Sequence, residues 1–454
     1  MYDRILSGGA IVGSREIFRA DIAISGGRIA AIGHGLGELG DAAEVTELNG
    51  LYVFPGGVDM HAHLNEPGYT WREDFFHGTS AAAAGGITTV VDMPLQNDPT
   101  VWNDEIFERK ESIVSQRAVT DYAFLGALVD YNLDRLAGLN AAGACGFKVF
   151  IGPVSDDYRS LDTGTIRRAL AVVKKLGGLV CFHAEDYAIV KREEERAALE
   201  NRSTWRDFLD TRPVVAEVMA IHNVVDLVRE SGARAHICHI SHPDAAAALK
   251  AAQAEGLPIS GETCMHYLAL CEEDLIAGGS LFKCAPPLRS REDTLRLWAY
   301  VEDGTISCIA SDHSPCAAYE KDEQERGVFG VWGGISGIQT TMQLFYDRAV
   351  NRRGFDPTLV ASRFSEGPAR LVGLYGRKGA VQVGFDADLT IFDPDAAWRV
   401  EPESLLYLNK ISAFVGMEGR GCPVETIVRG TTVFADGEIG VRPGYGKLLR
   451  RREG

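Results

Sequence analysis

Two histidines one residue apart, His61 and His63, are the first side chains along the chain that could bind a metal ion together. Side chains two positions apart on a strand point to the same side, so both imidazoles can contact one cation. His183, His239 and Asp312 stand at the ends of further hydrophobic runs. An isolated histidine is more often a hydrogen-bonded core residue than a ligand. The repeated placement of these side chains at strand ends instead favours a binuclear metal centre, which indicates a metal-dependent hydrolase.

Lys148 lies within the apolar run Gly146–Ile151, where a lysine is rarely buried without a partner. Burial disfavours the ammonium form and lowers the lysine pKa, which yields a neutral amine that can take up carbon dioxide as a carbamate. The carbamate anion can bridge two divalent ions. We therefore expect an N6-carboxylysine at Lys148 that bridges two metal ions. The alternative is an ordinary lysine whose ammonium group reaches solvent from a strand end.

The elements that would position these residues alternate between strand and helix. Eight hydrophobic runs predict strands at 52–62, 87–93, 121–129, 145–151, 178–184, 234–240, 257–263 and 305–312. Apolar residues at helical spacing predict helices at 102–117, 132–142, 163–177, 213–231, 243–255 and 290–302. This alternation indicates an α/β fold, a (β/α)8 TIM-like barrel, in which the carboxyl ends of the strands meet on one face. The candidate ligands fall at or just inside those ends.

The two flanking regions alternate polar and apolar residues between turn signals. They predict short antiparallel strands that come from both termini and form one small β-sandwich. The expected domains are therefore a first sandwich part at 1–54, the metal-binding barrel at 55–375, and the second sandwich part with a C-terminal tail at 376–454. The charged insertion at 185–212 is expected to be a solvated helix, with a lid or an oligomer contact as the alternative.

The composition argues against several classes of partner. The 454 residues carry a formal net charge of −17, which repels nucleic acid and anionic membrane surfaces. The N-terminus lacks the apolar region of a signal peptide and no run of about 18 apolar residues occurs, so a cytoplasmic protein is expected. The nine cysteines include no Cys-x-x-Cys pair and are expected to be reduced core residues. A small neutral molecule is the expected partner.

Several motifs resemble those of the cyclic amidohydrolases, a family that includes dihydroorotases, allantoinases, hydantoinases and dihydropyrimidinases. The motifs are Asp59–Gly68, Ala83–Pro94, Gly146–Phe150, His183–Asp186, His239–Ser241, Glu262–Leu268, Cys284–Arg289, Ser311–Cys316 and Gly384–Leu389. The resemblance implies two divalent metal ions, expected to be zinc with manganese, cobalt or iron as alternatives. It also implies a homotetramer or homodimer. The implied metal ligands are His61, His63, carbamylated Lys148, His183, His239 and Asp312.

The resemblance also implies a mechanism. A hydroxide held between the two metal ions would attack the amide carbonyl of a cyclic substrate. Asp312 would act first as general base and then as general acid, so that the ring nitrogen leaves protonated. A catalytically inactive structural relative is the alternative from another class. Such relatives lose metal ligands, whereas the six implied ligands are all present here.

Four positions bear on the substrate within this family. Dihydroorotases read a substrate carboxylate with an arginine and polar companions at positions that correspond to Asn65, Leu95, Ala285 and Cys316. Without a cationic fork there is no bidentate carboxylate clamp, so dihydroorotate is not the expected substrate. Hydantoinases and dihydropyrimidinases carry a tyrosine for the oxyanion where this chain has Pro153.

The motifs are most similar to those of the allantoinases, which extends to Trp332–Ile335. The resemblance therefore implies a cyclic ureide as substrate, with allantoin hydrolysed to allantoate. Departures at Gln96, Met265 and 69–75 leave a hydantoinase or dihydropyrimidinase type of cyclic ureide hydrolase as the alternative. The candidate substrate contacts are Asn65, Ala285, Cys316 and Gly333.

Overall fold

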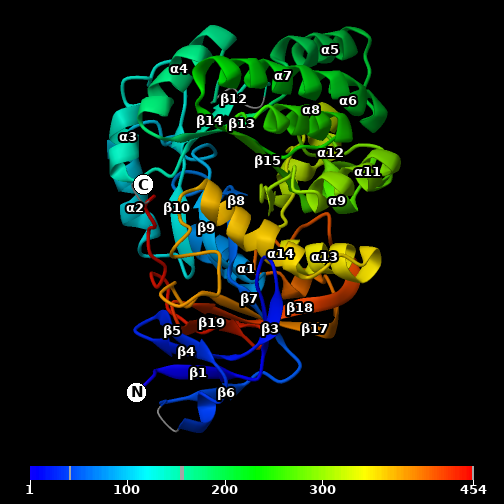
Figure 1. Cartoon of the computed structure of the whole chain (residues 1–454). Helices are drawn as coiled ribbons and strands as arrows, with labels where there is room; N and C mark the ends of the chain where they lie inside the picture. Colours follow the sequence, from blue (N-terminus) through cyan, green and yellow to red (C-terminus); the bar gives the residue numbers. More distant parts are fainter. Residues whose placement is uncertain (40–41, 154–157, 452–454) are drawn as a thin grey trace.

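A barrel of parallel strands forms the centre of the computed structural model, which describes residues 1–39, 42–153 and 158–451 (Figure 1). Within these residues the barrel strands are β8 (Gly57–Ala62), β9 (Ile87–Asp92), β10 (Asp121–Phe124), β11 (Gly126–Ala127), β12 (Phe147–Phe150), β13 (Leu179–His183), β14 (Arg234–Ile237), β15 (Ile259–Cys264) and β16 (Cys308–Ala310). The last strand returns to the first, because Ala62 bridges His313 in parallel and the His63 amide donates to the His313 carbonyl at 2.9 Å. The predicted (β/α)8 barrel is confirmed.

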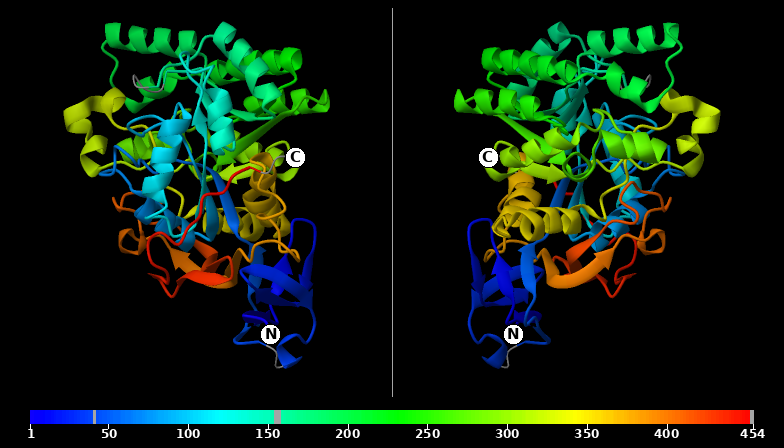
Figure 2. Two further views of the ribbon diagram at one scale, coloured as in Figure 1. Left: turned by 90° about the vertical axis from the view of Figure 1, so that its left-hand side faces the viewer. Right: turned by 90° about the vertical axis from the view of Figure 1, so that its right-hand side faces the viewer.

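The barrel strands are buried along almost their whole length because both of their faces are covered. All six residues of β9 are buried, for example, as expected for a parallel strand between a barrel interior and a layer of helices. Figures 1 and 2 show helices outside the strands. In the described residues they are α1 (Phe75–Ala84), α2 (Asp104–Val114), α3 (Leu136–Ala142), α4 (Thr163–Lys175), α5 (Tyr187–Leu199), α6 (Trp205–Thr211), α7 (Val214–Ser231), α8 (Pro243–Ala254), α9 (Met265–Ala269), α10 (Glu272–Gly278), α11 (Arg291–Glu302), α12 (Glu323–Gly330), α13 (Thr341–Tyr346), α14 (Thr358–Ala361) and α15 (Gly367–Leu371).

Each of the six predicted helices is found, in the order α2, α3, α4, α7, α8 and α11. Side-chain caps fix four of their starts: Asn103, Asp162, His242 and Ser290 each accept a hydrogen bond from a backbone amide of the first turn. Helix α1 was not predicted. It is buried on nearly all sides, so its sequence has no polar face from which a helical period could be read.

Strands from both ends of the chain form a β-rich part beside the barrel, at the bottom of Figure 1. One sheet has the order β5-β4-β1-β6, and the other has the order β20-β19-β18-β17-β7-β2-β3. Their bounds are β1 (Arg4–Ser7), β2 (Ala10–Val12), β3 (Ile17–Arg19), β4 (Asp21–Ser25), β5 (Arg28–Gly33), β6 (Val45–Glu47), β7 (Tyr52–Pro55), β17 (Leu389–Arg399), β18 (Glu418–Val428), β19 (Thr431–Ala435) and β20 (Glu438–Ile439). The domain limits 1–54, 55–375 and 376–454 stay a proposal.

The single strand predicted at 52–62 is wrong, because the run divides at Gly56. The first part, β7, pairs antiparallel with β17, whereas the second part, β8, pairs with β9 in the barrel. A β-carbon at Gly56 would lie 2.3 Å from the side chain of Thr88 on β9. The close approach of the chain to β9 at this division therefore requires glycine. Both halves are apolar, and the hydropathy pattern therefore contains no signal for the break.

A buried ion network joins the barrel to the β-rich part. Lys378 Nζ lies 2.7 Å from an oxygen of Asp121, which starts β10, and 3.3 Å from Asp386, and it also contacts Asp388. All four side chains are almost completely buried. The charges offset one another only while every partner is in place.

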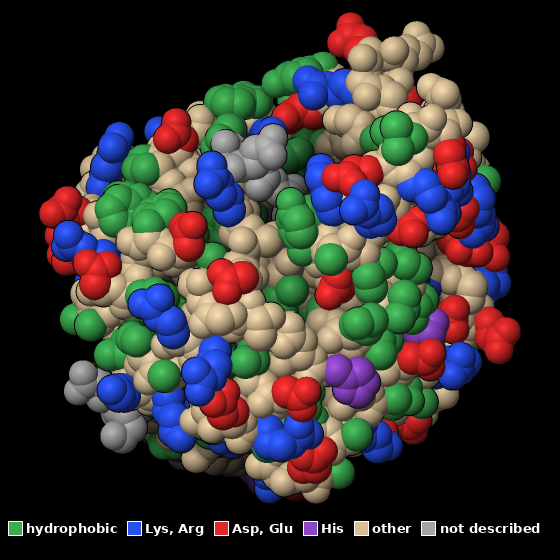
Figure 3. Space-filling view, turned by 90° about the horizontal axis from the view of Figure 1, so that it is seen from above, with side chains coloured by type: hydrophobic (Ala, Val, Ile, Leu, Met, Phe, Trp, Pro, Cys, Tyr) green, Lys and Arg blue, Asp and Glu red, His purple; other side chains and the backbone are tan. Residues whose placement is uncertain are grey.

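The insertion at 185–212 is helical, as predicted, and forms α5 and α6. Its exposed side chains include the ion pairs Arg192–Glu195 and Arg196–Glu193, each three residues apart. Seen from above, acidic and basic side chains are interspersed over the surface (Figure 3). None of the helices in the described part of the chain combines the length and apolar character that crossing a membrane requires.

Candidate active site

Strands β8 and β16 bring three of the predicted ligands to one point at the carboxyl face of the barrel. His61 Nε2 lies 3.3 Å from Asp312 Oδ1, and His63 Nε2 lies 3.4 Å from the same oxygen. The two imidazole rings are 5.4 Å apart, so both face the carboxylate as side chains two positions apart on a strand should. The arrangement offers two nitrogens and one oxygen to a single cation.

Strands β13 and β14 position the second pair of histidines. His183 is the last residue of β13, and His239 follows β14 by two residues. His183 Nδ1 lies 2.9 Å from His239 Nε2, and a nitrogen of His239 lies within 4.8 Å of ligand atoms of His61 and Asp312. The two pairs of histidines therefore flank one buried space.

Two of these residues have a backbone conformation that is rare outside glycine. His239 has a φ of 35° and Asp312 has a φ of 44°, both in the left-handed region. Such residues carry a conformational cost that the surrounding structure must offset, and they gather at functional sites. The backbone turn at each of these two strand ends therefore serves to direct the side chain towards the site.

Lys148 lies on β12 with its side chain fully inside the barrel. Its Nζ donates to Cys238 Sγ at 3.1 Å and lies 5.2 Å from the centre of the Phe150 ring. The expectation of a lowered pKa for Lys148 is wrong for the metal-free protein. Burial does lower the pKa of Lys148, but the neighbouring Cys238, Asp312 and Glu262 outweigh it, and the net pKa is raised.

Two buried carboxylates outside the predicted ligand set hold the outer nitrogens of candidate ligands. Glu262, on β15, contacts His61 Nδ1 and lies 3.2 Å from His236 Nε2. Glu185, which follows His183 closely in the sequence, has its Oε2 2.9 Å from His183 Nε2. Partners of this kind fix the tautomer and orientation of a metal-binding imidazole. A charged residue inside the strand predicted at 257–263 was the available signal for Glu262.

Two further carboxylates close to the candidate ligands bind backbone amides rather than an imidazole. Asp59 Oδ1 accepts hydrogen bonds from the backbone amides of His61 and Ser311, both at 3.2 Å. Asp59 thus ties the ends of β8 and β16 together. Asp186 caps the start of α5 by accepting from the Ile189 amide.

The electrostatics of the metal-free site favour added positive charge. Burial and the Lys148 ammonium lower the pKa of His61, but Asp312 and Glu262 outweigh both and raise it to about 10. Burial raises the pKa of Asp312, but His61, His63 and His239 hold it well below its usual range. A proton on His61 therefore balances the carboxylates in the absence of metal. A divalent cation between the imidazoles and Asp312 would supply that charge instead, so the donor set fits the implied metal ions.

A cavity of about 1500 Å³ opens at this face of the barrel. Two of the four candidate substrate contacts, Ala285 and Gly333, line it. Asn65 is buried, and its Nδ2 donates to the His63 carbonyl at 3.0 Å, while its Oδ1 has no hydrogen-bond partner among the described residues. Cys316 is buried at 2% exposure. Asn65 therefore adjoins His63, a candidate metal ligand, rather than the open cavity.

Tyr158 is the tyrosine nearest in sequence to the hydantoinase position at Pro153. Its hydroxyl donates to the Lys148 carbonyl at 2.6 Å and accepts from the Leu128 amide at 3.0 Å. Both interactions are with backbone groups, which hold the hydroxyl in place. Tyr158 therefore lacks the free hydroxyl donor that an oxyanion partner needs.

Comparisons with known proteins agree with this geometry. The model of the Amidohydrolase family matches residues 52–433. An allantoinase of Solibacter usitatus (strain Ellin6076) is 40% identical over 99% of this chain and 97% of its own length, and an allantoinase of Salmonella newport (strain SL254) is 37% identical over 95% of each chain.

Among solved structures, the L-hydantoinase (dihydropyrimidinase) from Arthrobacter aurescens matches with a TM-score of 0.97 at 31% identity, over 99% of this chain and 100% of its own. A dihydropyrimidinase from Brevibacillus agri NCHU1002 matches with a TM-score of 0.93 at 28% identity, over 99% of each chain. The similarity in sequence and in structure therefore covers almost the whole chain. The chain belongs to the amidohydrolase family.

Proposed function

We propose that the protein hydrolyses the cyclic amide bond of a ureide and that its substrate is allantoin, which it converts to allantoate. The observation that carries the proposal is the identity of 40% and 37% with two allantoinases over nearly the full length of the chain. The convergence of His61, His63, His239 and Asp312 at one face of the barrel supports the chemistry.

In the proposed reaction the side chains of the site bind metal or transfer a proton. His61 and His63 would hold one cation with Asp312, and His183 and His239 would hold the other, with a carboxylated Lys148 between them. Two divalent ions, zinc with manganese, cobalt or iron as alternatives, would acidify a water molecule and polarise the substrate carbonyl. Asp312 accepts the proton of the attacking water and delivers it to the departing ring nitrogen, so the C–N bond breaks without leaving an anionic amide.

The substrate preference rests on neutral side chains. Asn65 and Ala285 stand where a dihydroorotase needs a carboxylate-binding arginine and its polar companion, and neither can neutralise a carboxylate. Leu95, a further member of this set, lines the cavity and adds an apolar surface. These residues suit a neutral ureide.

A hydantoinase type of cyclic ureide hydrolase is the second candidate. The TM-score of 0.97 with the Arthrobacter aurescens L-hydantoinase favours it. The cavity of about 1500 Å³ also has room for a hydantoin that carries a large substituent. Against it, the Tyr158 hydroxyl is already bound by backbone groups.

A substrate panel tests the proposal. Metal-replete enzyme is assayed with allantoin, hydantoin, 5-substituted hydantoins, dihydrouracil and dihydroorotate, and kcat/KM is compared. Allantoin should lead, and dihydroorotate should be at least about a thousandfold poorer because its carboxylate stays unpaired. A higher kcat/KM for a 5-substituted hydantoin would replace the allantoinase proposal by the hydantoinase one. Absence of bound metal and of any turnover would favour an inactive structural relative.

We also propose that the protein is a cytoplasmic homo-oligomer, a tetramer or dimer. Helix α7 supports a contact between copies, because Val215 and Met219 are each half-exposed on one of its faces. Leu199, at the end of α5, is 85% exposed. Light scattering of the wild type and of Met219→Asp should differ in mass if this face is the contact. A monomeric wild type would contradict it.

A further inference from the structure

The motif Glu262–Leu268 places two more metal-binding side chains beside Asp312. Cys264 ends β15, and His266 lies in the first turn of α9. Ligand atoms of Cys264, His266 and Asp312 all lie within 4.8 Å of one another. Cys264 and His266 are buried, and the proposed reaction uses neither of them.

His266 differs from the other buried histidines in having two free nitrogens. Neither its Nδ1 nor its Nε2 has a hydrogen-bond partner among the described residues, although the side chain is only 1% exposed. Leaving two buried polar atoms unpaired costs free energy, so a buried histidine of this kind needs a ligand. One of these nitrogens lies within 4.8 Å of an anionic oxygen of Asp312 and of the Cys264 thiol, which is the environment of a cation rather than of an anion.

A neighbouring cluster shows the contrast. His236, Glu262 and Cys308 also have ligand atoms within 4.8 Å of one another. In this cluster His236 Nδ1 lies 2.8 Å from Ser260 Oγ and His236 Nε2 lies 3.2 Å from Glu262 Oε2. Its donors and acceptors are already engaged, so it has no vacant ligand atom on the histidine. Both clusters have ligand atoms close together, so it is the unpaired nitrogens of His266 that distinguish the Cys264 cluster.

We propose that Cys264, His266 and Asp312 form a third cation site, for a thiophilic divalent ion such as Zn²⁺ or Cd²⁺, and that an ion bound there inhibits the enzyme. Bond lengths of about 2.0–2.3 Å to zinc place tetrahedral ligand atoms about 3.5 Å apart, so atoms now within 4.8 Å of one another need to close by about 1.3 Å at most. The inhibition rests on the proposed function, because the ion withdraws the Asp312 carboxylate from proton transfer.

The chemistry of occupation is a ligand exchange without a redox step. The incoming ion takes a lone pair from His266 and one from Asp312, and it displaces the proton of the Cys264 thiol to solvent. Burial raises the pKa of this thiol well above its usual value. Occupation must therefore release a proton that a buried thiol does not give up by itself.

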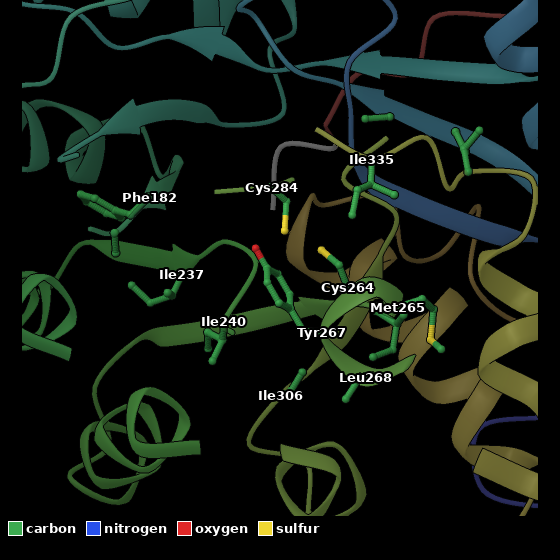
Figure 4. Close-up of a cluster of buried hydrophobic side chains, with 14 of the residues drawn as sticks. Phe182, Ile237, Ile240, Cys264, Met265, Tyr267, Leu268, Cys284, Ile306 and Ile335 are labelled. Atoms are coloured by element: carbon green, nitrogen blue, oxygen red, sulfur yellow. The ribbon is translucent and has the colours of Figure 1, made fainter. Parts of the chain in front are cut away.

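A second thiol, Cys284, lies between the cavity and the proposed site. Asp312 is 13% exposed, and Cys284 lines the cavity. In Figure 4 the sulfurs of Cys264 and Cys284 and the hydroxyl of Tyr267 point into one common region. The Tyr267 hydroxyl also donates to the Pro286 carbonyl at 2.6 Å. Cys284 is thus the rival thiol that an experiment must separate from Cys264.

The experiment titrates metal-replete enzyme with Cd²⁺ and follows three signals: the ultraviolet absorption of a cadmium–thiolate bond, the total bound metal, and the hydrolysis rate. The wild type should bind one equivalent beyond its resident ions with a thiolate band. At free Cd²⁺ about ten times the dissociation constant, mass action predicts about a tenfold fall in rate. Excess Zn²⁺ should inhibit in the same way without the band.

Three serine variants assign the thiol. Cys264→Ser should lose the band and require at least about tenfold more Cd²⁺ for half-inhibition, relative to its own uninhibited rate, because the softest ligand is gone. Cys422→Ser, on β18 in the β-rich part, should behave as wild type. If Cys284→Ser abolishes the band while Cys264→Ser keeps it, the proposal is overturned.

Further outcomes separate this site from folding defects and from the proposed function. His266→Asn keeps the thiol but removes the imidazole, and it should retain a weaker band. Urea unfolding of His266→Asn and Cys264→Ser excludes a collapsed barrel as the cause of weaker cadmium binding. Inhibition that accompanies release of resident metal would overturn the third site. The band and stoichiometry do not depend on the substrate, so a failed allantoin assay leaves them as an independent test.

Discussion

Glu185 is expected to hold the metal-binding form of His183. Its Oε2 accepts from His183 Nε2 at 2.9 Å, which leaves Nδ1 without a proton and free to bind a cation beside His239. Arg212 lies 2.6 Å from the same oxygen and is itself 8% exposed. The change Glu185→Gln preserves size and removes the negative charge on which both neighbours depend.

The structure sets the size of two effects. Loss of a partner that orients a metal ligand lowers metal affinity about 10–100-fold, or about 1.4–2.7 kcal/mol. Leaving a buried charge without its partner costs about 3–5 kcal/mol of unfolding free energy. Arg212 keeps Glu194 at 3.3 Å and the Pro153 carbonyl at 3.2 Å, so we expect a loss at the lower end of that range.

The stability effect should depend on pH. Burial raises the pKa of Glu185, but Arg212 and His183 lower it overall to about 2. A depressed carboxyl pKa contributes stability above the unfolded-state value of about 4.3, and that stability is lost as the pH falls towards the folded-state value. In the metal-free protein the difference between wild type and Glu185→Gln should therefore shrink as the pH falls from about 5 to 2.

Chelator competition and urea unfolding measure the two effects. Only the metal equivalent held by His183 and His239 should lose affinity in Glu185→Gln, since His61 keeps Glu262 as its own partner. Glu230→Gln is the matched control, because Glu230 forms an exposed pair with Arg167 and such pairs contribute little. If both metal equivalents weaken alike, Glu185 acts on the fold and the assignment to His183 is refuted.

Four other changes test separate parts of the structure. Lys148→Ala should lower both metal content and turnover by orders of magnitude, with partial rescue by short-chain carboxylates; full metal content with near-normal turnover would exclude the carbamate. Asp312→Asn should reduce turnover far more than metal content and remove the acidic limb of the rate profile, and an unchanged profile would exclude Asp312 as the base. Lys378→Ala should lower the unfolding free energy by about 3–5 kcal/mol, because it strands buried carboxylates, whereas Lys250→Ala at an exposed pair should change it by less than about 1 kcal/mol in the same urea titration. Burial raises the pKa of Glu73 to about 8. The folded protein therefore keeps a proton that the unfolded chain loses, and stability falls as the pH rises from about 4.5 to 8 by up to about 1.4 kcal/mol per pH unit; Glu73→Gln should flatten this fall, and parallel curves would contradict it.

The barrel could be predicted from the sequence because its signals are local. Most barrel strands are buried on both faces and lie in largely apolar runs, and each predicted helix carries an apolar stripe. Prediction failed where burial erased the pattern. Helix α1 has no polar face, and the division at Gly56 depends on the contact with Thr88, which lies 32 residues further along the chain.

The site could be predicted only in part for a related reason. His61, His63 and Asp312 follow strands, and the geometry of a barrel brings strand ends together wherever they stand in the sequence. The carboxylates that hold these ligands could not be predicted in this way. Glu262 reaches His61 across 201 positions, and no spacing rule predicts that contact. The pKa of Lys148 was mispredicted because its anionic neighbours are equally remote in sequence.

The charge of the cavity explains why the substrate should be neutral. Five arginines line the cavity: Arg72, Arg159, Arg202, Arg212 and Arg326. The side chains of Arg72 and Arg212 are largely buried and already engaged, Arg72 by Glu320 and by the Trp332 ring at 4.0 Å, and Arg212 by Glu185. Recruiting either of these two for a substrate carboxylate would strand a buried acid. A neutral ureide needs no such exchange, since its amide groups can pair with neutral donors and acceptors and with backbone groups at the cavity wall. We therefore expect selection against dihydroorotate to follow from the missing arginine at Asn65 together with the prior engagement of Arg72 and Arg212.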